Sequence, residues 1–397
     1  MELNSDIISK ENSKSNWINR YSDVRNHSVD ICKPLEIEDY VVQPIVDVSP
    51  PKWHLGHTTW FFETFILQPY CTGYKVFDPQ YNFVFNSYYE TVGARVIRTD
   101  RGNLSRPSVS EIFRYREYVD ENMKVFLNSE FFNNDIEPIL ELGLNHEQQH
   151  QELLLTDIKY ILGHNPLFPP YKPQGLNQNI PVNKVEMIGF PEGVYEIGSF
   201  GDSFCFDNEL GRHKVFLNDF EISSSLVTNQ EYLEFMADGG YEDFRHWHAE
   251  GWDWVKQTQA NSPLYWHFID GEWMHYTWSG LQKINLDEDL CHINFFEASA
   301  YAAWKGMRLP TEEEWETASD HFKWGKRWEW TNSAYLPYPG FKKEAGAVGE
   351  YNGKFMINQM VLRGASEATP EEHSRNTYRN FFPTHLQWQF TGIRLAK

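Results

Sequence analysis

Residues 143–155 read GLNHEQQHQELLL, and their apolar spacing predicts a helix that carries His146 and His150 on one face. Two imidazoles four residues apart can bind one metal ion. The stretch also contains the HExxH pattern of zinc peptidases, in which Glu147 would act as general base. On a helix, Glu147 and Gln149 lie about 80° to either side of the two histidines, so geometry alone does not select a base. Two histidines leave the metal site incomplete.

A second pair of histidines occurs in PPKWHLGHTTWFFETF, residues 50–65, near the start of another predicted helix. In an antiparallel bundle, one histidine from this helix and the pair from the other could complete three corners of a coordination sphere. A lone helical histidine is more often solvated or hydrogen-bonded than bound to metal, and we expect this role for His54. The candidate third ligand is upstream and no HxxGxxH follows, which weakens the peptidase interpretation.

Four segments of the N-terminal part have the apolar spacing of amphipathic helices. They are residues 16–32, 51–68, 109–128 and 136–162, and four such helices predict a bundle. Ser49, before two prolines, is the expected N-cap of the second helix, and Ser108 or Ser110 that of the third. The long interval 69–108 is rich in Tyr, Asn, Gly and Arg, which indicates a functional loop rather than a disordered one.

Repeated Pro, Gly and Asn residues interrupt the chain after the fourth helix. They cannot sustain a helix or a central strand, so residues 166–184 are expected to link two domains. From residue 185 onward, short β-prone pieces alternate with two helical segments, TNQEYLEFMADG and NFFEASAYAAWKG, and with Trp-rich loops. We therefore expect a four-helix domain at 15–165 and an α+β domain at 185–397.

Composition narrows the class of partner. Lys and Arg number 35 and Asp and Glu 56, a formal charge of −21, which disfavours nucleic acid and anionic lipid and favours a small molecule. The four cysteines are widely spaced without a CxxC pair, as expected in a reducing cytoplasm. The N-terminal sequence has no apolar signal-peptide core and no segment is apolar enough to span a membrane, so a cytoplasmic protein without a membrane partner is expected.

Six motifs follow one another along the chain: WHLGHTTWFFETF, FNSYYETVGARVIRTDRGNLSRPS, NHEQQHQELLLTDI, VTNQEYLEFMADGGY, RLPTEEEWE and RNTYRNFFPTHLQWQFTGIRLA. Together they resemble one enzyme family, the ergothioneine-pathway sulfoxide synthases, EgtB. The resemblance covers nearly the whole chain, and six motifs in the right order are specific. It implies a DinB-like four-helix bundle followed by a formylglycine-generating-enzyme-like (sulfatase-modifying-factor) domain with a C-type-lectin-type fold.

The resemblance also implies a mononuclear non-haem Fe(II) site with three histidine ligands, His57, His146 and His150. Three imidazoles equally suit zinc, so iron rests on the resemblance alone. The implied reaction is an O2-dependent union of imidazole C2 of hercynine (Nα-trimethylhistidine) with the sulfur of cysteine, giving hercynylcysteine S-oxide. Tyr88 and Tyr89 are the candidate catalytic residues, because phenols can supply both protons and electrons.

Substrate contacts follow from the same resemblance. A trimethylammonium group donates no hydrogen bond, so dipoles and aromatic walls are expected around hercynine. Gln149 and Asn380 match the polar contacts of the family, and Phe381, Phe382 and Trp388 are the expected aromatic walls. Arg101 and Arg106 are the candidates for binding the carboxylate of cysteine, since a guanidinium matches a carboxylate bidentately.

One departure from the family bears on the sulfur donor. Members that use γ-glutamylcysteine have RNWD where this chain has RNFF, with Phe382 in place of the aspartate. The paired tyrosines instead resemble the branch that uses free cysteine. The alternatives left open are γ-glutamylcysteine as donor, histidine as acceptor (the ovothiol route), a selenium donor, an HExxH zinc hydrolase, and a ligand-binding module without catalysis. The sequence leaves the oligomeric state undefined.

Overall fold

The computed structural model describes residues 2–172, 185–343 and 352–397, with residues 2–13 as backbone only. The chain divides into two compact units, Met1–Leu167 and Phe168–Lys397, called unit 1 and unit 2 below. Most of the linker expected at 166–184 falls outside the described residues.

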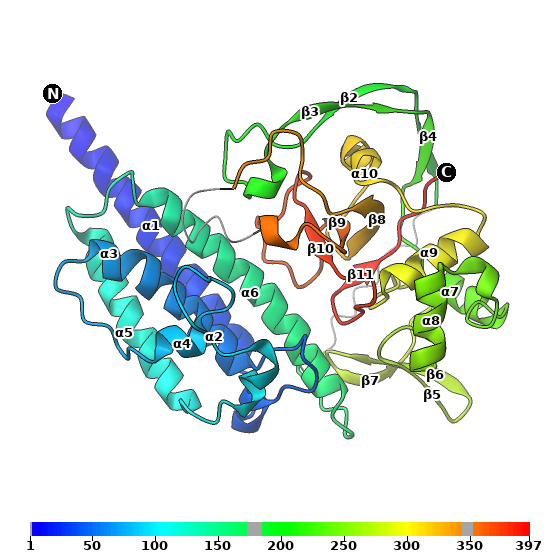
Figure 1. The fold of residues 1–397 in the computed structure, drawn as a ribbon, viewed down its shortest axis with the longest axis horizontal. Helices are drawn as coiled ribbons and strands as arrows, with labels where there is room; N and C mark the ends of the chain where they lie inside the picture. The colour runs from blue at the N-terminus through cyan, green and yellow to red at the C-terminus, as the bar shows by residue number, and fades with distance from the viewer. Residues whose placement is uncertain (1, 173–184, 344–351) are drawn as a thin grey trace. The chain divides into compact units, whose positions relative to one another are not determined.

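Unit 1 is a helical bundle (Figure 1). Its helices are α1 (Glu2–Cys32), α2 (Pro51–Phe62), α3 (Gln68–Tyr70), α4 (Tyr81–Phe85), α5 (Val109–Asn128) and α6 (Glu137–Gly163), with a π-helical segment η2 (Glu63–Leu67) and 3-10 turns η1 (Ile37–Val41) and η3 (Arg98–Asn103). The long helices pack together, α2 against α5 and α6, and α1 against α5 and α6. The four helices expected from apolar spacing are confirmed.

Two helix starts differ from the expected ones. α1 begins at Glu2, well before the predicted start, because a polar helical segment has no apolar periodicity to detect. α2 has Pro50 as its N-cap and no side-chain cap, so the prediction of Ser49 was wrong. The Ser49 hydroxyl accepts instead a hydrogen bond from Arg101 Nη1 at 2.9 Å. Ser108 caps α5 with a capping box, as predicted.

Two glycines let the elements of unit 1 approach closely. A Cβ at Gly143 of α6 would lie 2.8 Å from ring carbons of both Phe61 and Phe62 on α2. A Cβ at Gly56 of α2 would overlap the ring of Phe85 on α4. Since real Cβ atoms do not approach other atoms so closely, only glycine fits at either position without moving a helix or a ring. The contact at Gly143 brings together the two helices that carry the histidines, α2 and α6.

Unit 2 is an α+β unit of short elements. Its strands are β1 (Met187–Phe190), β2 (Gly193–Ile197), β3 (His213–Leu217), β4 (Phe220–Ser223), β5 (Trp266–Ile269), β6 (Glu272–Thr277), β7 (Gly280–Lys283), β8 (Trp328–Ala334), β9 (Met360–Gly364), β10 (Asn380–Phe382) and β11 (Thr391–Gly392). They form a four-stranded sheet β10-β9-β8-β11, a three-stranded sheet β5-β6-β7, and the pairs β1-β4 and β2-β3. β8 pairs antiparallel with β9 and parallel with β11.

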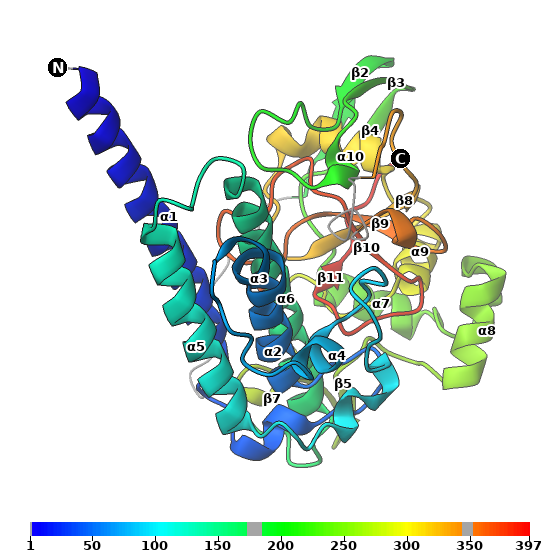
Figure 2. The ribbon, with the colours of Figure 1, turned by 60° about the vertical axis from the view of Figure 1, so that its left-hand side comes forward.

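The helices of unit 2 are equally short. They are α7 (Asn229–Ala237), α8 (Ala249–Thr258), α9 (Phe295–Trp304) and α10 (Glu312–Ala318), with 3-10 turns η4 (Asp207–Glu209), η5 (Phe244–His246), η6 (Ser319–His321) and η8 (Gly353–Phe355). α10 packs against β8, β9 and the β2–β3 hairpin, as Figures 1 and 2 both show. Trp315 of α10 is buried and donates a hydrogen bond to Glu329 of β8 at 2.6 Å, while the buried Trp330 of β8 contacts Phe295 of α9 edge to face. A helical unit followed by an α+β unit confirms the fold class expected from the sequence.

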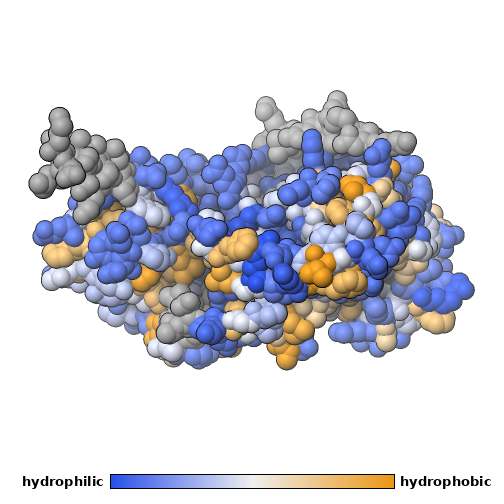
Figure 3. Space-filling view, turned by 90° about the horizontal axis from the view of Figure 1, so that it is seen from above, coloured by the Kyte–Doolittle hydropathy of each residue, from blue (hydrophilic) through white to orange (hydrophobic). Residues whose placement is uncertain are grey.

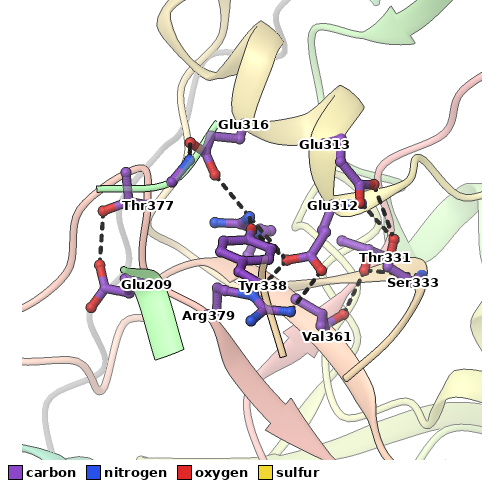
Figure 4. A network of polar contacts seen from close by, with 12 residues as sticks. Glu209, Glu312, Glu313, Glu316, Thr331, Ser333, Tyr338, Val361, Thr377 and Arg379 are labelled. Carbon is purple, nitrogen blue, oxygen red and sulfur yellow. Dashed lines mark hydrogen bonds and ion pairs between the residues drawn. The ribbon is translucent and has the colours of Figure 1, made fainter. Parts of the chain in front are cut away.

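An ion-pair network holds β10 from the side of α10 (Figure 4). The carboxylate of Glu312 accepts hydrogen bonds from Arg379 Nε and Nη2, both at 2.8 Å, and from Arg363 Nη2 at 3.0 Å. The Tyr338 hydroxyl donates to the same carboxylate. Although burial opposes it, Arg379 and Arg363 lower the pKa of Glu312. Because Arg379 directly precedes Asn380, this network fixes the start of β10.

The surface agrees with the polar composition of the chain. The face seen in Figure 3 is mostly hydrophilic, with hydrophobic residues in small scattered groups. In the described part of the chain, no helix is both long enough and apolar enough to cross a membrane.

Candidate metal centre

Three histidine side chains of unit 1 meet at one point. His57 of α2 and His146 and His150 of α6 present ring nitrogens that all lie within 4.8 Å of one another. The Nε2 atoms of His57 and His146 are 3.3 Å apart, which is close to the separation of two nitrogens that each lie about 2.1 Å from a shared ion. Among the described residues, this trio is the one cluster of His, Cys, Asp or Glu side chains that could hold a metal ion. The structure thus brings together the three predicted ligands.

The ring of His57 is fixed in plane and in tautomer. Its Nδ1–H donates to the carbonyl oxygen of Phe85 at 2.6 Å, which leaves the Nε2 lone pair directed toward His146. The indoles of Trp53 and Trp60 stack on the imidazole, with ring centroids 4.7 and 5.6 Å away and planes within 10° and 18° of parallel. One hydrogen bond and two stacked rings therefore hold this imidazole in position.

The three imidazoles are neutral at physiological pH. Burial and the neighbouring His146 hold the pKa of His57 well below its usual value. Burial lowers the pKa of His146 to about 4, and burial together with the other histidines lowers that of His150. Neutral imidazole is the metal-binding form, so this donor set fits a divalent ion of the zinc or iron type.

Glu147 is not available as a general base at the histidine site. Its carboxylate accepts hydrogen bonds from Arg25 Nη1 at 2.8 Å, Arg116 Nη2 at 2.6 Å and the Ser28 hydroxyl at 2.6 Å. Burial would raise the pKa of Glu147, but Arg116 and Arg25 lower it to about 2. A carboxylate ion-paired to two buried arginines cannot take a proton from water at neutral pH. The zinc-hydrolase interpretation of the HExxH pattern is therefore wrong in its choice of base.

Arg101 and Arg106, the two predicted carboxylate-binding residues, lie in different surroundings. Arg101 is buried, with its guanidinium carbon 3.3 Å from the ring centroid of Trp53, and Arg106 is exposed and donates to the carbonyl of Ser105. Within the described residues no carboxylate lies within ion-pair distance of Arg101, and its Nε has no hydrogen-bond partner. The buried arginines that do pair with carboxylates are Arg25, Arg116, Arg327, Arg363, Arg379 and Arg394. Burial lowers the pKa of Arg101 to about 9.

Tyr88 and Tyr89 connect to the histidines through one indole. Their rings stack with centroids 4.7 Å apart, and Tyr89 is buried while Tyr88 is half-buried. The Tyr89 ring lies 5.6 Å from that of Trp60, which in turn stacks on His57. An aromatic contact path therefore runs from the tyrosine pair to a candidate metal ligand.

His54 lies beside the trio. It is buried, and its two ring nitrogens lie 2.9 Å from His150 Nδ1 and 2.9 Å from Asp157 Oδ2, which confirms the expected hydrogen-bonded role. Sequence reasoning missed Asp157. The available signal was its position seven residues after His150, two helical turns along the same face. Gln149, the predicted hercynine contact on α6, is half-buried.

The other predicted substrate contacts belong to unit 2. Asn380, Phe381 and Phe382 form β10, and each is half-buried. The Phe381 ring stacks on that of Tyr335 at 4.1 Å between centroids, and Phe382 contacts Trp388 edge to face at 5.4 Å. The partly exposed rings of this strand leave surface that a ligand could contact.

Comparison with known proteins places the chain in a family. Residues 173–327 match the sulfatase-modifying factor enzyme 1-like domain. The hercynine oxygenase of Mycolicibacterium smegmatis is 30% identical over 311 residues, which cover 64% of this chain and 70% of that protein. The chain belongs to the hercynine oxygenase family.

A second hercynine oxygenase, from Mycobacterium tuberculosis, is 28% identical over 306 residues, covering 65% of this chain and 71% of that protein. The formylglycine-generating enzyme of Streptomyces coelicolor is 28% identical over 155 residues, covering 36% and 49% of the two chains. Membership of the hercynine oxygenase family supports an oxygenase, and the histidine trio is consistent with the metal site of such an enzyme.

Proposed function

We propose that the protein is a non-haem Fe(II)- and O2-dependent sulfoxide synthase that joins hercynine to cysteine in ergothioneine biosynthesis. The observation that carries the proposal is the trio His57, His146 and His150 in a chain of the hercynine oxygenase family. The imidazole C2–H and the thiol S–H are lost, a C–S bond forms, one oxygen atom goes to sulfur and the other leaves as water. We place this reaction in the cytoplasm, where cysteine is reduced.

The three histidines would hold the iron and keep its charge. Neutral imidazoles contribute no negative charge, so a bound ion retains its full dipositive charge, which favours binding of a thiolate. When bound, Fe(II) supplies the site at which dioxygen is activated. The protein's own contribution is to fix the ligand rings, which Phe85, Trp53 and Trp60 do for His57.

We assign the carboxylate of cysteine to Arg101 rather than to Arg106. A buried guanidinium without a carboxylate partner among the described residues is costly unless a ligand supplies the anion. Arg101 packs on Trp53, whose ring also contacts His57 and His150, so an anion bound there would lie close to the proposed metal. Arg106 is exposed, where such a contact would be weakened by water.

We assign proton and electron supply to the tyrosine pair and hercynine binding to four further residues. The contact of the Tyr89 ring with Trp60, which stacks on His57, supports this assignment. For hercynine we propose Gln149 beside His150 and, from β10 of unit 2, Asn380, Phe381 and Phe382. The aromatic faces of Phe381 and Phe382 suit a trimethylammonium cation.

Product analysis tests the proposal. Purified protein loaded with Fe(II) is mixed with oxygen and with hercynine or histidine, each paired with cysteine, γ-glutamylcysteine or a selenosugar, and the products are identified by mass spectrometry. We expect the mass of hercynylcysteine S-oxide only where hercynine and cysteine are both present. A faster reaction with γ-glutamylcysteine, histidine or the selenium donor would replace the proposed substrates, and no C–S or C–Se product in any mixture would refute the synthase.

A further inference from the structure

We propose that His54 and Asp157 are positioning residues for the metal site, forming a hydrogen-bonded chain that holds His150 with its Nε2 lone pair toward the ion. The inference rests on the proposed metal site and names two residues that would not themselves bind the ion. It follows from the two contacts of His54, which engage both of its ring nitrogens.

The direction of each hydrogen bond in the chain follows from Asp157. A carboxylate only accepts, so the His54 Nε2–H donates to Asp157 Oδ2 across 2.9 Å. With its proton on Nε2, the His54 ring has a lone pair on Nδ1, which can only accept, and the partner at 2.9 Å is Nδ1 of His150. His150 therefore carries its proton on Nδ1, and its Nε2 is left with the lone pair that a metal needs.

The antiparallel pairing of α2 with α6 brings His54 of α2 beside both His150 and Asp157 of α6. Gly143 of α6 lies against Phe61 and Phe62 near the end of α2, and His146 lies against His57 one turn earlier. His150 and Asp157 then meet His54, close to the start of α2. Positions 146, 150 and 157 share one face of α6, so Asp157 lies on the same face of the helix as the two histidine ligands.

Asp157 is held at the end of the chain by the backbone. The same Oδ2 atom accepts a hydrogen bond from the Ser49 N–H at 2.8 Å, and the carboxylate is buried. Arg101, whose charge interacts with Asp157, donates to the Ser49 hydroxyl. Because a carboxylate with two donors cannot swing away freely, the orientation of Asp157 is transmitted through His54 to His150.

A histidine that only fills the core would need one acceptor at most. His54 instead lies between a metal-ligand ring and a buried carboxylate, at hydrogen-bond distance from both. Removing an outer-shell partner of a metal-binding histidine typically lowers metal affinity roughly 10- to 100-fold. The same range is the expected effect of breaking this chain at His54.

Two substitutions of His54 separate orientation from packing. His54→Phe keeps the ring volume and removes both hydrogen bonds. His54→Gln keeps one donor for Asp157 and one acceptor for His150. Thr156→Val, a change of similar size next to Asp157, is the control, since the Thr156 hydroxyl donates only to the Glu152 carbonyl. Asp157→Leu breaks the chain at its other end, and it serves as the second test if His54→Phe does not fold.

The measurement is Co²⁺ binding to the metal-free full chain, followed by visible absorption and by competition with a chelator, with folding checked by circular dichroism. We expect about 10- to 100-fold weaker binding and an altered cobalt spectrum in His54→Phe and Asp157→Leu, partial recovery in His54→Gln, and wild-type values in Thr156→Val. Wild-type affinity and spectrum in folded His54→Phe or Asp157→Leu would overturn this inference alone. Failure of the wild-type chain to bind Co²⁺ or Fe²⁺ would overturn the proposed metal site as well.

Discussion

The imidazole of His57 lies parallel to the indole of Trp53, with ring centroids 4.7 Å apart and 10° between the planes. This stack, together with the hydrogen bond from His57 Nδ1 to the Phe85 carbonyl, determines where the Nε2 lone pair points. A ligand that is oriented before the metal arrives loses little conformational entropy on binding. The contribution of His57 to metal affinity should therefore be large.

We predict that His57→Ala abolishes metal binding. Two histidines on one helix leave the coordination sphere without its third protein ligand, and iron content after anaerobic loading should fall from about one equivalent to near zero. Iron is measured by elemental analysis. His164→Ala, at the C-cap of α6 and 14 residues beyond His150, is the matched control and should retain iron. Full occupancy in His57→Ala would mean that another residue is the third ligand.

Binding of the sulfur donor should depend on Arg101. Arg101→Lys keeps the charge but loses the paired donors that match a carboxylate, so KM for cysteine should rise about 10- to 100-fold with a smaller change in kcat. Arg106→Lys, the exposed counterpart, should leave both constants near their wild-type values. Steady-state kinetics with cysteine as the varied substrate decide the matter. An equal effect of the two substitutions would argue against the buried arginine as the specific contact.

Removing a phenol from the tyrosine pair should change the product rather than the binding. In Tyr88→Phe or Tyr89→Phe we predict that turnover shifts from C–S bond formation toward oxidation of the thiol to sulfinate, because the proton or electron supplied by the phenol is missing. The ratio of the two products is measured by mass spectrometry. The control is Tyr118→Phe, because the Tyr118 hydroxyl donates to the Lys75 carbonyl and not to a residue of the site. Unchanged ratios in both variants would remove the pair from the mechanism.

Glu147 should be needed for stability and not for hydrolysis. Glu147→Gln leaves Arg116 buried without an anionic partner, and breaking a buried ion pair in this way costs roughly 3–5 kcal/mol of unfolding free energy. Chemical denaturation measures that loss. Glu141→Gln disrupts only the partly exposed pair with Arg20, which should cost at most about 1 kcal/mol. Peptide cleavage that depends on Glu147 would contradict its structural role.

The free energy of unfolding of unit 2 should depend on pH through the carboxyl group of Glu297. Burial raises the pKa of this carboxyl from 4.5 to about 7, although Tyr241, the Asn294 N–H and Gln387 donate hydrogen bonds to it. The folded protein thus binds this proton more tightly than the unfolded chain. The resulting stabilisation is fully present below about pH 4.5 and is lost as the pH rises through about 7, by up to about 1.4 kcal/mol per pH unit.

Glu297→Gln should remove that slope, because an amide does not titrate. The measurement is the free energy of unfolding between pH 5 and about 7 for the wild type and the variant. Glu231→Gln is the control, since Glu231 occupies the equivalent capping-box position in α7 but is only half-buried. A variant that keeps the wild-type slope would show that another group titrates in this range.

Apolar spacing was sufficient to predict the long helices, because each buries one face against the others. It could not predict the start of α1, whose first residues are polar, or α10, which is too short to give a clear period. α8 was also missed, although it is as long as the predicted α9. The cap at Ser49 was missed for a different reason. Its hydroxyl and its N–H bond to Arg101 and Asp157, residues distant in sequence, and such tertiary contacts override local capping preferences.

Spacing within the sequence could place His146 and His150 on one face, but it could not choose between His54 and His57. The choice of His57 came from the family resemblance. The structure gives the physical reason, since His57 is one turn closer to His146 while His54 is engaged by Asp157. The partners of Glu147, from α1 and α5, could not be found from sequence because they depend on how the bundle closes.

The absence of a side chain at Gly56 and Gly143 determines how closely the elements around the metal centre approach one another. Metal–nitrogen bonds accept deviations of only about 0.2 Å, whereas a methyl group at Gly143 would have to displace the rings of Phe61 and Phe62 by several times that amount or push α6 away from α2. Exchanging one hydrogen for a methyl group in a purely apolar contact would then change which ions the protein accepts, without altering any atom that binds them.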